Sequence, residues 1–166
     1  FSISTFGQSV KFSGKIDGAK SDTLFFYALE AEGIQAIDSV ILDTKGSFKH
    51  KVDLKGFTYL RVGFKPNNYS LLLIDPDTDK KVSISSSQKE ELLENLNVTG
   101  SLYSQKGINF LKKGNEYFEY KTKTQQELQS LSGEQRTALT EELREKAQAF
   151  INLRDSFIQR NMNTPL

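Results

Sequence analysis

The sequence predicts an α+β protein: an antiparallel β-sandwich or partly open barrel of about seven to eight strands, followed by a C-terminal two-helix hairpin. From Phe6 to about Val98, apolar and polar residues alternate with period two, and turn residues interrupt the alternation roughly every eight to twelve residues. From Ser101 onward, apolar residues recur at helical spacing. We therefore expect a β domain over residues 6–100 and a helical hairpin over residues 101–164.

Length and composition support one domain with an appendage. A chain of 166 residues is well below the size at which single cores stop growing. With 37% hydrophobic and 26% charged residues, it holds enough apolar material for a core. Its 22 Lys and Arg balance 21 Asp and Glu, so no long-range field exists to attract nucleic acid or an anionic membrane.

Seven strands are expected in the first part of the chain. The second has apolar residues on both faces, so it should be central or covered on its second side. Turn residues at Asp17–Asp22 and Asp43–Gly46 separate neighbouring strands. The expected strands are Val10–Ile16, Thr23–Ala31, Ile34–Asp43, Ser47–Leu54, Phe57–Lys65, Tyr69–Asp75 and Lys80–Ser85.

Two helices are expected after Gly100. Ser101 should cap the first, because its hydroxyl can accept a hydrogen bond from an unpaired backbone N–H. Gly107 and Gly114 lie on the apolar stripe of this helix and indicate close packing, with a kink or a weaker helix as alternatives.

The second helix has a stronger signal. Ser132 and Gln135 fit a capping box, and the helix should end near Asn163. About 30 helical residues would span roughly 45 Å, more than a small sheet needs, so part of the hairpin should project or pack on a partner. The interaction surface expected on its apolar stripe consists of Leu139, Leu143, Phe150 and Phe157.

The chain lacks the residues for several kinds of chemistry. It contains no Cys, which excludes a thiol nucleophile, a redox pair, a thiolate metal site and a disulfide within the chain. The single histidine, His50, alternates with charged residues on a strand, so it should be a structural histidine on the core face or its margin. A hydrolase built on His50 is the least favoured hypothesis. We expect no catalytic residue and no cofactor.

A metal site is not expected either. Asp75, Asp77 and Asp79 have the alternate spacing of a calcium loop, whose oxygens must converge on the ion. Lys80 stands where the sixth position needs Gly, and Ser86 stands where the twelfth needs Glu. A polar hairpin tip explains these residues better.

Aromatic residues on the strands allow a second class of function. Tyr59 and Tyr69 could belong to a platform for sugars or peptides, although strand aromatics are more often part of the core. Basic residues alternate with acidic ones, unlike the continuous basic stripe of a nucleic-acid-binding protein. No apolar run is long enough to span a bilayer.

The order of several short motifs resembles one family: the N-terminal domain of unknown function that precedes a thioredoxin-like domain in envelope thiol-disulfide oxidoreductases of Gram-negative bacteria. The resemblance covers nearly the whole chain. Its motifs lie at Phe12–Ile16, Thr23–Tyr27, Asp38–Asp43, Gly46–Phe48, Tyr59–Gly63 and Val98–Ser101.

The resemblance implies an exported protein, often a lipoprotein, whose redox chemistry belongs to a Cys-x-x-Cys in the later domain. The chain begins with Phe1 and ends at Leu166, about where that domain would follow, so it looks like a trimmed fragment that could have carried a signal or lipid anchor. No catalytic residue carries over to it.

We expect a noncatalytic domain of the periplasm or cell envelope. It would position the missing thioredoxin-like domain through homodimerisation or by docking a client protein. The alternative is a cell-surface module that binds glycans or peptides.

Overall fold

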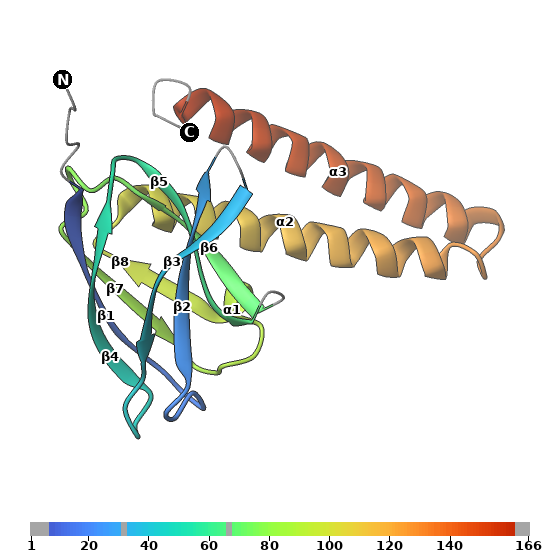
Figure 1. Cartoon of the computed structure of the whole chain (residues 1–166). Helices are drawn as coiled ribbons and strands as arrows, with labels where there is room; N and C mark the ends of the chain where they lie inside the picture. Colours follow the sequence, from blue (N-terminus) through green and yellow to red (C-terminus); the bar gives the residue numbers. More distant parts are fainter. Residues whose placement is uncertain (1–6, 31–32, 66–67, 162–166) are drawn as a thin grey trace. The chain divides into compact units, whose positions relative to one another are not determined.

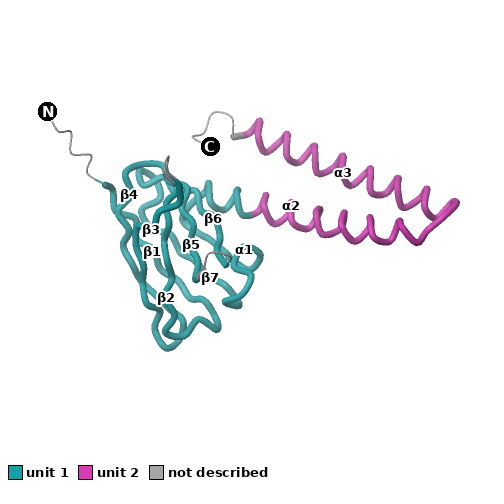
Figure 2. The backbone as a smooth tube through the Cα atoms, turned by 45° about the vertical axis from the view of Figure 1, so that its right-hand side comes forward, with its two compact units in different colours: residues 1–108 teal, residues 109–166 magenta. Residues whose placement is uncertain are grey.

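The computed structural model describes residues 7–30, 33–65 and 68–161 (Figure 1). The chain divides into two compact units, residues 1–108 and 109–166 (Figure 2). Unit 1 holds the strands, and unit 2 holds most of the two long helices. The predicted β-domain start at Phe6, strand end at Ala31 and helix end at Asn163 lie outside the described residues.

The α+β fold class is confirmed. The described residues form eight strands in two open four-stranded sheets, with orders β4-β1-β7-β8 and β3-β2-β5-β6. The strands are β1 (Gln8–Ile16), β2 (Thr23–Glu30), β3 (Gly33–Ile41), β4 (Ser47–Leu54), β5 (Thr58–Lys65), β6 (Asn68–Ile74), β7 (Lys81–Ser86) and β8 (Leu96–Thr99). The helices are α1 (Leu92–Asn95), α2 (Leu102–Glu127) and α3 (Gly133–Asn161).

One strand pair departs from the predicted antiparallel arrangement. β1 and β7 run parallel, with Phe12 opposite Val82 and Gly14 opposite Ile84. Alternation shows which face of a strand is buried but not the direction of its neighbour, so the sequence could not reveal this pair. β2 lies between β3 and β5, which confirms that it is an internal strand.

The core of unit 1 lies between the two sheets. It forms because the inward positions of the alternating strands are apolar. The Phe12 and Phe26 rings, 5.2 Å apart, join the sheets at its centre. Leu24, Leu60 and Ile84 are completely buried. Burying one such side chain stabilises the fold by about 1.5–3 kcal/mol relative to leaving it exposed.

The start of α2 is held against β6 by two buried serines. The Ser104 backbone N–H donates to Ser101 Oγ at 3.3 Å, which confirms the predicted helix cap. Both hydroxyls donate to the carbonyl oxygen of Leu73, at 3.0 Å and 2.9 Å, and the Leu73 N–H donates to Ser104 Oγ at 3.0 Å. A Cβ added at Gly107 would lie 3.4 Å from Leu73 Cδ1, so the predicted close packing is present here.

The helical hairpin is built differently from the sandwich. Ile108, near the start of α2, is buried in the core of unit 1, but no apolar side chain of residues 109–161 is fully buried. A Cβ added at Gly114 would lie 3.7 Å from the Phe150 ring, an ordinary van der Waals distance, so this position has room for a methyl group and does not require glycine. Of the helices in the described ranges, none is both long and apolar enough to cross a membrane.

Candidate functional site

In the acidic loop between β6 and β7, two carboxylates accept hydrogen bonds from backbone N–H groups of the loop itself. The Asp75 N–H donates to Asp79 Oδ2 at 3.0 Å, and the Asp77 N–H donates to Asp75 Oδ1 at 3.0 Å. Asp79 is buried. Within residues 7–161, apart from the undescribed gaps, no three His, Asp or Glu side chains are grouped as metal ligands. These contacts are those of a polar turn.

His50 bridges the edge strands of the two sheets. Its Nε2 lies 2.9 Å from Asp38 Oδ2, so these two side chains bring β4 and β3 into contact across the side of the sandwich. The imidazole also stacks on the Phe26 ring, with centroids 5.8 Å apart. The side chain is only 25% exposed. His50 therefore lies at the core margin, in a position that suits a structural histidine.

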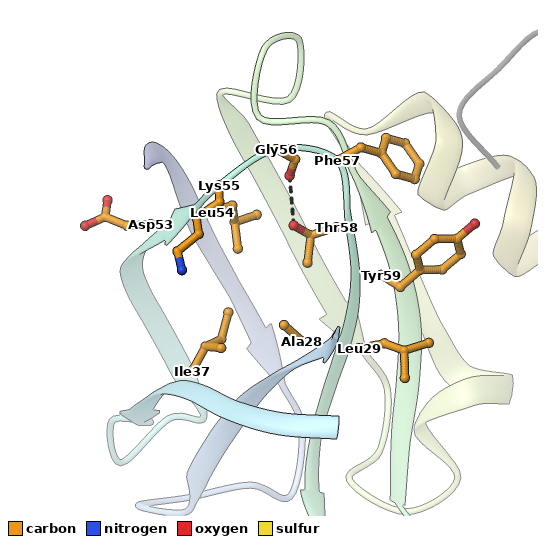
Figure 3. Close-up of a pocket in the computed structure, with 10 residues that line it drawn as sticks. All are labelled: Ala28, Leu29, Ile37, Asp53, Leu54, Lys55, Gly56, Phe57, Thr58 and Tyr59. Atoms are coloured by element: carbon orange, nitrogen blue, oxygen red, sulfur yellow. Dashed lines mark hydrogen bonds between the residues drawn. The ribbon is translucent and has the colours of Figure 1, made fainter. Parts of the chain in front are cut away.

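A cavity of about 370 Å³ opens in unit 1 beside the loop that joins β4 to β5 (Figure 3). Its wall is polar and apolar in about equal parts. The Thr58 hydroxyl donates to the Gly56 carbonyl at 2.8 Å. Asp53 and Tyr59 lie on opposite sides of it (Figure 3). Its size suits a small ligand or a single side chain. The lining residues are Ala28, Leu29, Ile37, Asp53, Leu54, Lys55, Gly56, Phe57, Thr58 and Tyr59.

The two tyrosines of the predicted binding platform have different surroundings. Tyr59 lines the cavity and makes an edge contact with Phe57 at 5.8 Å. Tyr69 is covered by the Arg61 guanidinium, whose central carbon lies 3.8 Å from the ring centroid. Each tyrosine is half-buried. They therefore do not form one open aromatic surface, and Tyr59, but not Tyr69, lines this cavity.

The predicted interaction stripe lies along α3, and all four of its residues are half-buried. Phe150 stacks on Tyr117 with ring centroids 4.7 Å apart, and Phe157 stacks on Phe110 at 4.5 Å. The two phenylalanines thus face α2 within the hairpin. Leu139 and Leu143 occupy the half of α3 nearer the turn.

A groove of about 340 Å³ runs between the hairpin helices on one side. Lys146 Nζ lies 4.6 Å from the centroid of the Tyr120 ring. Burial, with the Glu142 carboxylate, raises the pKa of the Tyr120 hydroxyl above 10.0. Sequence reasoning missed this groove because it depends on how the two helices are registered. Its lining residues are Lys113, Glu116, Tyr117, Tyr120, Lys146, Ala149, Phe150 and Leu153.

Comparison with protein-family models gives one match, to a domain of unknown function, DUF4369, over residues 10–106. This span is more than half of the chain and runs from the third residue of β1 to the first turn of α2.

The chain belongs to this family.

The match confirms the resemblance as far as the domain itself is concerned, and the rest of the hairpin lies beyond it. Searches of the curated proteins and of the solved structures give no match.

Proposed function

We propose that this DUF4369 chain is the noncatalytic N-terminal domain of an exported thiol-disulfide oxidoreductase. In this proposal it positions a thioredoxin-like domain by forming a dimer or by docking a client protein. One observation carries the proposal: residues 109–161 of the two long helices include many aromatic and aliphatic side chains, and none of these side chains is fully buried. Such a helix pair gains stability by packing against a further element.

The chemistry of the chain supports a positioning role. Without Cys it has no thiol to exchange, and its single imidazole is engaged by Asp38 and Phe26. In the β6–β7 loop, the Asp75 and Asp79 carboxylates accept hydrogen bonds from backbone N–H groups, and the Asp77 carboxylate accepts one from the Gln8 side-chain amide. Export to the periplasm or cell envelope belongs to the same proposal and is supported by the family resemblance alone.

A deletion in the parent oxidoreductase tests the proposal. Removing residues 7–160 should leave the reduction rate of a small aromatic disulfide unchanged, because that reaction needs only the thioredoxin-like domain. The reduction rate of a folded protein disulfide should fall, because positioning is lost. An open reading frame without a Cys-x-x-Cys domain after Leu166, or equal client rates with and without the deletion, would overturn the proposal.

The cavity beside Tyr59 favours a second candidate, a module that binds a glycan or a peptide side chain. The chain contains no Trp, so tyrosine fluorescence can report binding directly. A saturable ligand should lose affinity with Tyr59→Ala and keep it with Tyr69→Ala, since only Tyr59 lines the cavity. Equal affinity in both variants would eliminate this candidate.

A further inference from the structure

The sheet β3-β2-β5-β6 has an outer side that faces away from the core. The inward residues of β2, β5 and β6 are buried in the core, among them Phe26, Val62 and Leu72. Because side chains alternate between the two faces of a strand, the residues between these point outward. Arg61 carries the only charge among the outward residues of these three strands whose side chains the structure describes. Those residues are Thr23, Phe25, Tyr27, Leu29, Tyr59, Arg61, Tyr69, Leu71 and Leu73.

Arg61 lies at the centre of this side, among aromatic and aliphatic residues. In the strand register it is opposite Tyr27 of β2 and opposite Leu71 of β6. Phe25 and Tyr69 precede these two residues by two positions, so they are the diagonal neighbours of Arg61. The Phe25 and Tyr27 ring centroids are 5.9 Å apart. All five residues are half-buried, and together we call them the Arg61 face.

The Arg61 guanidinium has an aromatic partner but no acidic partner within the described ranges. Its central carbon lies 3.8 Å from the Tyr69 ring centroid, and no described carboxylate lies within ion-pair distance of it. By contrast, Lys89, also in unit 1, pairs with Asp22 at 2.7 Å. A guanidinium stacked on a ring keeps its N–H groups in its own plane, where they can donate to an acceptor. Arg61 therefore has donors that the described side chains leave without an acceptor.

These observations specify the chemistry of a partner for this face. A carboxylate is the acceptor that matches a guanidinium in shape and charge, through two parallel hydrogen bonds. The stack on Tyr69 holds the Arg61 side chain in place, so binding costs less side-chain entropy. The surrounding rings and Leu71 offer apolar contact area beside that carboxylate. The face spans three strands about 4.8 Å apart, which suits an extended peptide segment.

We propose that the Arg61 face docks a peptide segment of a client protein in which a carboxylate side chain lies between apolar side chains. The carboxylate pairs with Arg61, and the apolar side chains contact Phe25, Tyr27 and Leu71. This inference rests on the client-docking form of the proposed function and deepens it by naming the surface and the chemistry of the client. A basic client segment would be repelled, since no described outward carboxylate of β2, β5 or β6 offsets the charge of Arg61.

Binding of two blocked peptides to the full chain tests this surface. One is acetyl-Ser-Phe-Glu-Phe-Ser-amide, and the other has Gln in place of Glu. Because the chain has no Trp and the peptides have no Tyr, tyrosine fluorescence reports on the chain alone. The Glu peptide should bind saturably and about tenfold more tightly than the Gln peptide, because its hydrogen bonds join two charged groups. Equal affinities, or no saturable binding of the Glu peptide, would overturn the inference.

Substituting Arg61 shows whether this residue recognises the carboxylate. In Arg61→Gln the two peptides should bind equally well. The matched control is Lys51→Gln, which removes an exposed cation from β4 of the other sheet and should keep the preference for the Glu peptide. A preference that survives Arg61→Gln would overturn the inference. If Arg61→Gln misfolds, NMR of the unsubstituted chain decides: the Arg61 Nε–H resonance should shift with the Glu peptide only, and an unmoved resonance would contradict the proposed pair.

Two further outcomes separate this surface from other possibilities. A light-scattering mass of twice 18.8 kDa, with neither peptide bound, would assign the face to a second copy of the chain and overturn the inference. Failure of the peptide test removes this docking surface but leaves the dimerisation form of the proposed function, which the deletion in the parent protein tests separately.

Discussion

Substituting Ser104 with Ala should loosen the attachment of α2 to the sandwich. Ser104 Oγ accepts the Leu73 N–H at 3.0 Å and donates to the Leu73 carbonyl at 2.9 Å, and its side chain is fully buried. After the substitution the carbonyl keeps its bond from Ser101, but the N–H loses its partner. A buried donor without a partner costs about 1–3 kcal/mol. We expect the free energy of unfolding to fall by that amount.

The two serines should be energetically coupled. Ser101→Ala alone leaves the Leu73 carbonyl bonded to Ser104, so the loss should be smaller, about 1 kcal/mol for a helix cap. The double variant leaves both polar groups of Leu73 without a side-chain partner. Its loss should therefore exceed the sum of the two single losses by about 0.5–3 kcal/mol, the usual range for residues in one network.

Urea denaturation followed by circular dichroism measures these losses, and amide hydrogen exchange at Leu73 measures the local effect. The control is Ser83→Ala, because Ser83 is exposed on β7 and should change stability by less than about 0.5 kcal/mol. If Ser104→Ala keeps both the unfolding midpoint and the protection of the Leu73 amide, the reasoning about this network is wrong.

Three other substitutions test the packing and the turns. Gly14→Ala should prevent stable folding, since its Cβ would lie 1.7 Å from the Ile84 carbonyl oxygen; a folded, soluble product would contradict this. Gly114→Ala should raise the free energy of unfolding of the hairpin by up to about 1 kcal/mol, because the methyl group meets the Phe150 ring at an ordinary 3.7 Å; thermal melting checks it. Hydrogen bonds from the backbone N–H groups of Ser47 and Lys45 lower the pKa of Asp43 below 3.8. The ionised Asp43 therefore stabilises the folded state fully above pH 3.8. This contribution is lost as the pH falls through the lower pKa that Asp43 has in the folded state. Asp43→Asn should flatten the acid side of a stability profile measured between about pH 5 and pH 2, whereas an unchanged acid slope would show that Asp43 does not contribute.

Much of the sandwich could be predicted because the alternation of apolar and polar residues that marks a strand lies within a few consecutive residues. The strand at Ser47–Leu54 matches β4 residue for residue, since inward and outward positions alternate clearly there. The four-residue elements α1 and β8 were not predicted as separate elements, because so short a segment has no measurable period. The contact of His50 with Asp38 links two sheets, and a linear pattern cannot show which strands meet at an open side.

The hairpin shows a similar limit of prediction from the sequence. Helical spacing places Phe150 and Phe157 on one apolar stripe, but the spacing cannot tell whether α2 or a second protein covers them. The structure shows that both rings stack on α2.

We propose that this chain contributes to redox work by holding domains in place. The measurement that tests this proposal is the reduction rate of a folded protein disulfide by the parent oxidoreductase with and without residues 7–160. We predict that the deletion lowers this rate and leaves the rate for a small aromatic disulfide unchanged. A client rate that the deletion leaves undiminished would contradict the positioning role in both of its forms.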